Sequence, residues 1–434
     1  SNKNQNWLLP LSIKDMIPND HICFLVEDFV ESLDFSKFDI IYDGAGHPAY
    51  HPQIIMKIII QGMLSRIRSS RKLAGACREN FVFMYLAEKI SPDFRTIARF
   101  RKENADFVKS AFKKTLELAE KNKIIDISSV FIDGTKIKAY ASKKRYLGKI
   151  ALDKLDKAID KMIKEDIEID EIEEELFGDK EDGLTGVGRR DLKKIVREFN
   201  KSKNKKKLKE NIQKARQEFN THNVEKVSLS DSESRIMKNP KSYTEPSYNA
   251  QISVSKNQII IANDVCQDGH DAHQLIPQMR NIKENIRLRK DTKVGVDCGY
   301  SDGENIKFAE DNGIDLYVPS RAQAQEFDGK EQSLNHDKYE YDEVKDELIA
   351  DGIRYPYHHS YIRKNNRKKI FVYQLYGAKL RKQVPEFFRE RLRMKEKMEK
   401  PESRKIYSQR KNTVEPVIGN IKQNLGFREF LEGN

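Results

Sequence analysis

The chain has 434 residues and carries 80 Lys and Arg against 68 Asp and Glu, a formal net charge of +12 at pH 7. This length is enough for two or three domains with cores of their own, and the surplus of positive charge favours a polyanionic partner, most commonly nucleic acid. The longest apolar stretches, such as residues 54–60, are too short to cross a membrane, and the four cysteines are scattered without a CxxC pair. We therefore exclude a membrane partner, a disulfide framework and a thiolate zinc site, and expect a soluble chain from a reducing compartment.

Residues 1–125 have the pattern of a helical domain. Pro52 opens a run of isoleucines at helical spacing, and Ser91 or Asp93 is expected to cap a later helix. Basic side chains gather in this part of the chain: Arg66, Arg68, Arg71, Arg95, Arg99 and Lys102. A short helix, a turn and a basic helix are typical of a helix-turn-helix-like DNA reader. The alternative is an ordinary solvated helix face.

The chain then changes character. Residues 128–140 alternate apolar and polar side chains, which predicts a strand. Residues 147–229 are dense in charge, acidic over 166–176 and basic over 189–216. We expect a helical hairpin whose arms carry opposite charge, inserted into the main fold, although the composition fits partial disorder equally well.

Strand and helix signals alternate from residue 230 onward. Strands are expected at 248–254, 258–264, 293–298 and 315–319, and helices at 271–288, 303–312 and 386–425. The signals over 320–385 are mixed. We predict an α/β fold with a mixed sheet, built from residues 126–146 and 230–434, with a further insertion at 320–405. In such sheets chemistry collects at strand ends and on facing helices.

Three acids stand where this layout can bring them together. Asp133 lies inside the first strand, Asp297 ends a later strand, and Glu415 lies on the last basic helix. Carboxylates are rarely buried without a partner, and a cluster of three repels itself unless cations neutralise it. Oxygen-rich sites suit Mg²⁺, and two such ions can promote phosphodiester displacement. The plainer interpretation is an edge-strand acid, a turn acid and a solvated helix acid.

Several motifs resemble, in their order and spacing, the DDE transposases of bacterial insertion sequences. The matching segments are MIPNDH (16–21), GHPAYHPQIIMKIIIQGMLSRIRSSRKL (46–73), SPDFRTIARFRK (91–102), FIDGTKIKAYAS (131–142), SDSESRIM (230–237), YNAQISV (248–254), VGVDCGYSDGENI (294–306) and YSQRKNTVEPVIGNIKQNLGFREF (407–430). The resemblance implies an RNase H-like catalytic core behind a helical, DNA-binding N-terminal domain.

The same resemblance implies roles for individual residues. Asp133 and Asp297 resemble the two catalytic aspartates and Glu415 the catalytic glutamate, which together would hold two Mg²⁺ ions, with Mn²⁺ as a possible substitute. Nearby residues match the Tyr, Arg, Glu, Lys signature of related transposases and are implied to hold the DNA backbone near the cut: Tyr407, Arg410 and Lys422.

The implied activity is cleavage and strand transfer of double-stranded DNA, at the element's terminal repeats and at a target, by a homodimer in the bacterial cytoplasm at the nucleoid. Two alternatives stay open: a nuclease of the same fold that cuts without joining, and a transposase-derived DNA-binding protein without catalysis. The presence of all three acids counts against the second.

Two further segments raise the question of a metal site outside the three acids. Relatives often carry a cysteine cluster in the last insertion, but residues 355–382 contain no cysteine, so we expect no structural zinc there. In His270-Asp271-Ala272-His273, two histidines three residues apart could bind a metal. We favour the simpler interpretation that Asp271 caps the helix that follows.

Overall fold

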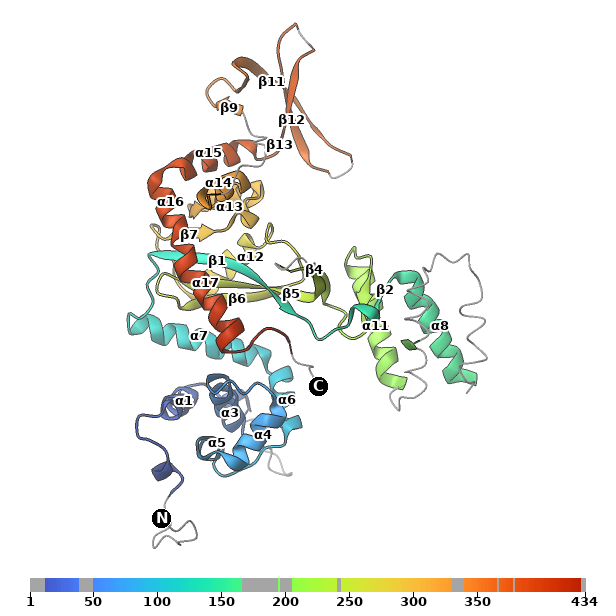
Figure 1. The fold of residues 1–434 in the computed structure, drawn as a ribbon, viewed down its shortest axis with the longest axis vertical. Helices are drawn as coiled ribbons and strands as arrows, with labels where there is room; N and C mark the ends of the chain where they lie inside the picture. The colour runs from blue at the N-terminus through green and yellow to red at the C-terminus, as the bar shows by residue number, and fades with distance from the viewer. Residues whose placement is uncertain are drawn as a thin grey trace. The chain divides into compact units, whose positions relative to one another are not determined.

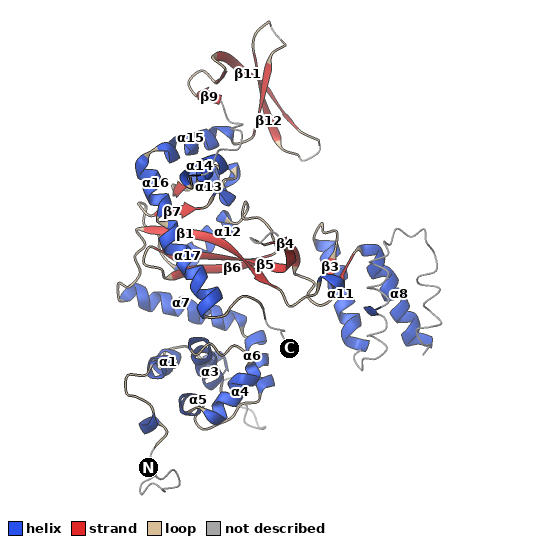
Figure 2. Ribbon diagram, in the orientation of Figure 1, coloured by secondary structure: helices blue, strands red, loops and turns tan. Residues whose placement is uncertain are grey.

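The computed structural model describes residues 12–38, 50–165, 194–195, 205–239, 243–329, 339–364, 367–377 and 379–430. The chain divides into two compact units. The first comprises residues 1–124, 421–427 and 431–434, and the second comprises residues 125–420 and 428–430. Helices and strands are mixed in the second unit, whereas the first is built of helices (Figure 2).

The helices of the first unit pack around one large apolar core, and Ile17, Cys23 and Leu86 form a second, smaller cluster. They are α1 (Ile22–Glu31), α3 (Pro52–Leu64), α4 (Ser70–Glu79), α5 (Phe81–Leu86), α6 (Phe94–Glu103) and α7 (Ala105–Lys121), after a short 3-10 turn η1 (Lys14–Met16). Pro52 occupies the first turn of α3, and Asp93 caps α6 by accepting a hydrogen bond from the backbone N–H of Arg95, as predicted. Ile58, Leu73 and Ile97 are fully buried in the core.

The second unit is centred on a mixed sheet (Figure 1). Its strands are β1 (Ser129–Lys138), β4 (Arg235–Lys238), β5 (Thr244–Ser255), β6 (Ile260–Cys266), β7 (Lys293–Val296) and β8 (Asp315–Tyr317). β1 is central: it pairs antiparallel with β5 and parallel with β7. β5 pairs antiparallel with both β6 and β4, and β7 pairs parallel with β8. The prediction of an α/β sheet core behind a helical N-terminal region is confirmed.

Helices cover both faces of this sheet. They are α12 (Leu275–Asn285), α13 (Gly303–Asp311), α14 (Arg321–Phe327), α15 (Phe388–Glu399), α16 (Pro401–Ser408) and α17 (Arg410–Gly419). Ser253 donates to Gln278 of α12, while Asp133 accepts from Arg410 of α17. Ser253 pairs with Ile132, the residue before Asp133, and successive side chains in a strand point to opposite faces. Thus α12 and α17 lie on opposite faces.

Two sequence expectations about helices are wrong. The helix expected from residue 271 begins at Leu275, its N-cap position is taken by Gln274, and Asp271 does not cap it. The single helix expected over residues 386–425 is instead α15, α16 and α17, followed by a π-helical turn, η4 (Asn420–Asn424). Pro401 starts the second of these helices, because proline fits the first turn but not a helix interior.

The first insertion forms a small body with a core of its own. A two-stranded pair, β2 (Tyr146–Leu147) with β3 (Val227–Ser228), leads into α8 (Lys149–Glu165) and α11 (Lys205–Thr221). Apolar side chains of the two helices pack together, among them Leu155, Ile159 and Ile212. Arg216 of α11 also pairs with Asp153 and Asp156 of α8. The acidic stretch 166–176 of the predicted hairpin lies outside the described residues.

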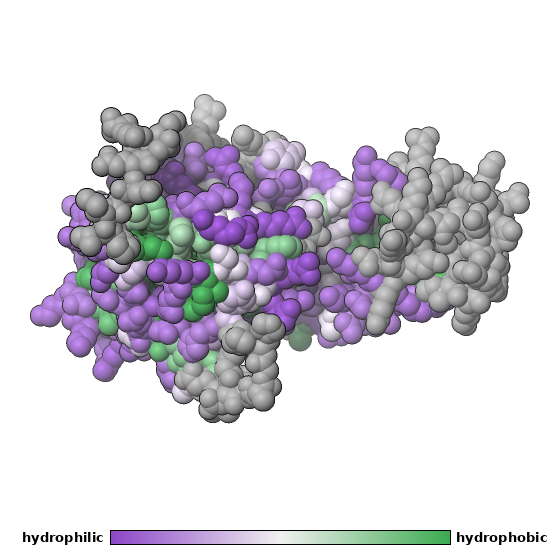
Figure 3. All heavy atoms as spheres, turned by 90° about the horizontal axis from the view of Figure 1, so that it is seen from below, coloured by the Kyte–Doolittle hydropathy of each residue, from purple (hydrophilic) through white to green (hydrophobic). Residues whose placement is uncertain are grey.

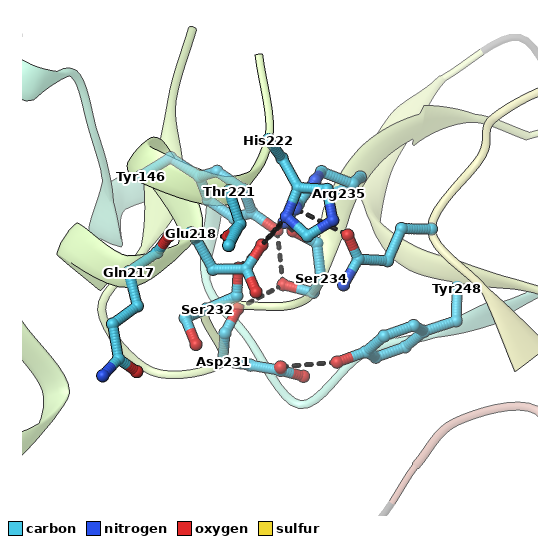
Figure 4. Close-up of polar contacts among 11 residues, drawn as sticks. Tyr146, Gln217, Glu218, Thr221, His222, Asp231, Ser232, Ser234, Arg235 and Tyr248 are labelled. Atoms are coloured by element: carbon cyan, nitrogen blue, oxygen red, sulfur yellow. Dashed lines mark hydrogen bonds and ion pairs between the residues drawn. The ribbon is translucent and has the colours of Figure 1, made fainter. Parts of the chain in front are cut away.

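Polar contacts of residues 230–237 join this insertion to the central sheet (Figure 4). Arg235 of β4 donates to Glu218 of α11 at 2.5 Å and to Gln267, just after β6, at 2.6 Å. Tyr248 of β5 donates its hydroxyl to Asp231 at 2.6 Å. Arg235 and Glu218 are both largely buried, so this ion pair anchors the base of the insertion.

The second insertion is an antiparallel sheet of five strands. They are β9 (Tyr339–Asp342), β10 (Glu347–Ala350), β11 (Ile353–Ile362), β12 (Lys369–Gln374) and β13 (Arg381–Pro385). Aromatic and aliphatic side chains of one face pack against the start of α15, where Tyr373 and Phe388 meet edge to face. The insertion thus rests on the helix that leads to the site.

The described residues on one face of the molecule are predominantly polar. In the view of Figure 3 most of the coloured atoms belong to hydrophilic residues, and apolar residues appear in small patches between them. Among the described helices, none is long and apolar enough to span a bilayer.

Candidate active site

The two aspartates lie side by side at the end of β7. β1 and β7 run parallel with Ile132 opposite Val296, so Asp133 and Asp297 are the next residues on strands that run about 4.8 Å apart. Asp133 accepts a hydrogen bond from the backbone N–H of Gly134 at 2.9 Å. Asp297 caps a 3-10 turn, η3 (Cys298–Tyr300), by accepting from the backbone N–H of Gly299 at 2.8 Å.

Arg410 connects the third acid to this pair. Its Nη1 donates to Asp133 Oδ2 at 2.8 Å, and its Nη2 lies 3.1 Å from Glu415 Oε1. The Arg410 side chain is 13% exposed, whereas that of Glu415 is 47% exposed. α17 packs across β1 and β5, so one guanidinium holds a carboxylate from the sheet and another from the helix above it (Figure 1).

The Tyr, Arg, Glu, Lys signature is divided between the two units. Tyr407 of α16 is half-buried, and the guanidinium of Arg410 lies 5.8 Å from the centre of its ring. Asp297 and Cys298 act electrostatically on the Tyr407 hydroxyl, so this residue belongs to the same cluster. Lys422 lies in the part of η4, residues 421–424, that belongs to the first unit rather than to the unit that carries the three acids.

The pKa values of both aspartates are raised, so a nearby positive charge would favour their ionised forms. Burial raises the pKa of Asp133 to about 7, Asp297 adds to this rise, and Arg410 opposes it. The pKa of Asp297 is also raised, chiefly by burial, while the Gly299 N–H and Arg410 act in the other direction. A divalent cation would favour the ionised forms, and carboxylate oxygens are the donors that Mg²⁺ prefers. The chemistry of these donors therefore suits this ion, although the oxygens of Asp133, Asp297 and Glu415 do not form a set of three within 4.8 Å of one another in the described structure.

Another group of potential ligands lies outside the predicted site. Within the described residues, one set of three has donor atoms all within 4.8 Å of one another: His273, Asp302 and Glu304. Asp302 accepts from Arg391 at 2.9 Å, and both acids stand at the N-terminus of α13, where negative charge stabilises a helix. His273 thus joins two helix-terminal acids, and His270 is not part of the group.

Sequence reasoning missed Asp271 as a neighbour of the site. Its Oδ1 accepts hydrogen bonds from Asn249 and Gln251 of β5, each at 2.7 Å. Its charge also contributes to the raised pKa of both Asp133 and Asp297. The available signal was topological: Asp271 follows β6, which is antiparallel to β5, so it lies at the same edge of the sheet as the end of β7.

The basic residues predicted to bind DNA occupy α4, α6 and the turn before α4. Five of them are exposed: Arg66, Arg71, Arg95, Arg99 and Lys102. Arg71 and Arg95 both lie near the ring of Phe94, at 4.9 and 5.6 Å from its centre. Arg68 is only half-exposed, because it donates to the carbonyl of Gly426 at 2.7 Å and stacks on Phe427 at 4.1 Å.

Comparison with known families agrees with this arrangement. A transposase domain matches residues 11–103, and a transposase DDE domain matches residues 216–431. The first covers most of the helical unit, and the second covers the sheet strands from β4 to β8 and the helices that follow. The chain belongs to the DDE transposases of the insertion-sequence type. No curated protein and no solved structure shows significant similarity to it.

Proposed function

We propose that this protein binds the ends of its insertion sequence. Its residues Asp133, Asp297 and Glu415 then catalyse the cutting and joining of DNA strands. The observation that carries the proposal is the convergence of these acids from two adjacent strands and one covering helix, with Arg410 bonded to two of them. The match to a transposase DDE domain supports the assignment of the reaction class.

The strand arrangement supports an RNase H-like core. The order β6-β5-β1-β7-β8 has three antiparallel strands followed by two that run parallel to β1. The first aspartate lies in the central strand and the second at the end of its parallel neighbour. This arrangement supports the RNase H-like core that we propose for the chain.

In the proposed reaction, Asp133, Asp297 and Glu415 hold two Mg²⁺ ions, which Mn²⁺ could replace. These ions would supply activation of the attacking oxygen and stabilisation of the leaving oxygen. Cleavage forms a bond from a water oxygen to phosphorus and breaks the bond to the 3′ oxygen, which leaves as a hydroxyl. In strand transfer that hydroxyl attacks a target phosphodiester, which releases a new 3′ hydroxyl.

The remaining residues of the signature would position the DNA. Arg410 is held by Asp133 and Glu415 and carries further N–H groups that suit a phosphate. Tyr407 beside it and Lys422 are proposed to contact the backbone near the cut. In this way the chain's own charges orient the scissile phosphate against the acids.

We assign recognition of the element ends to residues 1–125, with Arg66, Arg68, Arg71, Arg95, Arg99 and Lys102 as contacts. Catalysis belongs to residues 126–146 and 230–434, which are interrupted by the insertion at 147–229 and extended by that at 320–405. Because joining requires two ends, we propose that a homodimer acts on double-stranded DNA, in the bacterial cytoplasm at the nucleoid.

Incubating the full chain with DNA that carries its flanking element ends and Mg²⁺, and mapping the products, tests this function. We expect cuts at the element ends and joined products with target DNA. Cuts without joined products would favour the same-fold nuclease. Specific binding without either product would favour a transposase-derived DNA-binding protein.

A further inference from the structure

Asp271 reaches the site from the face of the sheet opposite to Arg410 and Glu415. Gln251, which holds it, shares a face with Ser253, the residue that bonds α12. The pairing of β1 with β7 ends at Ile132 and Val296, whereas β1 continues to Lys138. Past the end of β7, no described strand pairs with this edge of β1 until Lys138 bridges Glu429, and a side chain from the α12 face can approach the aspartates in that interval.

Two glycines next to the catalytic aspartates make room for this approach. A Cβ atom at Gly134 would lie 2.3 Å from Asp271 Oδ1, and one at Gly299 would lie 3.6 Å from Asp271 Oδ2. The same point at Gly299 is 2.8 Å from Asp297 Oδ1. One oxygen of Asp271 thus lies beside Gly134, and the other lies on the side of Asp297.

Buried amides fix the orientation of the Asp271 carboxylate. Asn249 and Gln251 are fully buried, and both donate to Oδ1. Gln251 is itself oriented, because its Oε1 accepts from the hydroxyl of the buried Tyr300. Asn305 then bonds the carbonyls of both Ala272 and Tyr300, at 2.5 and 3.0 Å, and ties the two loops together. Within the described part of the chain, Oδ2 accepts no hydrogen bond.

A simple ion pair does not account for this arrangement. Among the described residues, Lys136 forms an ion-pair contact with Asp271, but its Nζ lies 4.0 Å from Oδ1, on the oxygen that the two amides already occupy. The amides hold one oxygen and leave the other near Gly299, the residue whose backbone N–H donates to Asp297. We propose that Asp271 is a fourth carboxylate of the divalent-cation site, with Oδ2 as its ligand atom beside Asp297. This inference rests on the proposed function of the three acids.

Direct measurement of cation binding tests this role. Mn²⁺ binding to the full chain is followed by electron paramagnetic resonance for the wild type and for Asp271→Asn, which keeps the shape and the acceptor for Asn249 and Gln251. We expect Asp271→Asn to bind Mn²⁺ at least tenfold more weakly with an unchanged thermal midpoint in EDTA. The matched control is Asp311→Asn, which removes an exposed carboxylate at the end of α13 and should leave Mn²⁺ affinity unchanged.

A second variant separates a ligand from a positioning residue. In Asp271→Cys a thiolate should shift the cation preference from Mg²⁺ toward Cd²⁺, which only a ligand position can do. Wild-type Mn²⁺ affinity in Asp271→Asn, or an unchanged preference in Asp271→Cys, overturns the inference. Asp133→Asn and Asp297→Asn serve as references. If both variants retain Mn²⁺ binding, the proposed function itself fails. If both variants lose Mn²⁺ binding while Asp271→Asn keeps it, only this inference fails.

Discussion

At the scale of single residues, the site is a balance between buried negative charge and one guanidinium. Asp133 is 14% exposed and stands beside Asp297, whose charge adds to the cost of ionising the Asp133 carboxyl. Arg410 offsets part of this cost but also bonds Glu415. In the absence of bound cations, the ionised site should therefore weaken the fold.

The stability of the metal-free protein should depend on this balance. In Asp133 the folded pKa is raised to about 7, above the value of about 3.9 for an unfolded chain. The unfolded state then releases its proton first, so stability falls as the pH rises from about 4 to about 7. The Asp133→Asn variant has no carboxyl to ionise at this position, so it escapes this fall in stability. Between about pH 4 and about pH 7, the free energy of unfolding of the variant relative to wild type should therefore rise by about 1–4 kcal/mol.

Urea unfolding in EDTA at a series of pH values measures this difference. The relative stability should change little above about pH 8, where the carboxylate is already ionised in both states. If the free energy of unfolding of the two proteins changed with pH in the same way, the folded structure would not disfavour ionisation of Asp133.

Gly134 provides a steric prediction at the same scale. In Gly134→Ala the new methyl group would lie 2.3 Å from Asp271 Oδ1 and 2.5 Å from Gln251 Nε2. Because Gln251 is fully buried and bonded by Tyr300, relief requires movement of the sheet, at a cost of about 1–3 kcal/mol. Gly75→Ala is the matched control: it lies within α4 with open space around it and should be neutral or stabilising by about 0.5–1 kcal/mol. Equal urea midpoints for the two variants would contradict the crowding.

At the scale of elements, the spacing of apolar residues predicted those helices and strands that bury one face against the rest of the fold. The strands containing residues 130–137 and 294–296 were found because apolar side chains recur where the sheet is covered. The strands of residues 339–385 were not found, because their charged, aromatic and aliphatic residues follow no common alternation and their core includes the start of α15. Asp271 was misread as a cap because local spacing does not reveal the contacts with Asn249 and Gln251.

α6 carries the prediction on DNA binding. Arg95 and Arg99 are exposed. In the double variant Arg95→Ala/Arg99→Ala the affinity for element ends should fall. The slope of log affinity against log salt concentration should also become shallower, by the equivalent of about two phosphate contacts. Lys109→Ala/Lys113→Ala removes the same charge from the exposed face of α7 in the same unit and should change affinity much less. Fluorescence anisotropy over a range of salt concentrations measures both slopes. Identical slopes for the two double variants would remove α6 from the interface.

At the scale of the whole molecule, the proposed binding residues and the proposed catalytic acids lie in different units. The basic residues of α4 and α6 have no part in the core of the central sheet, and the three acids have no part in the core of the helical unit. The chain nevertheless returns to the first unit after α17, with residues 421–427, so the helix that carries Glu415 is covalently linked to both units.

This separation predicts that cleavage can be removed without removing binding. Asp133→Asn, Asp297→Asn and Glu415→Gln each keep the side-chain shape but lose the charge needed to hold a cation, so each should abolish cleavage. Affinity for element ends, measured by anisotropy in EDTA, should stay within about threefold of wild type, because none of these side chains is proposed to hold the recognition sequence. A variant that cuts at the wild-type rate would remove its residue from the site. A variant that loses cleavage and binding together, with an intact thermal midpoint, would show that the acids and the helical unit read the DNA as one surface.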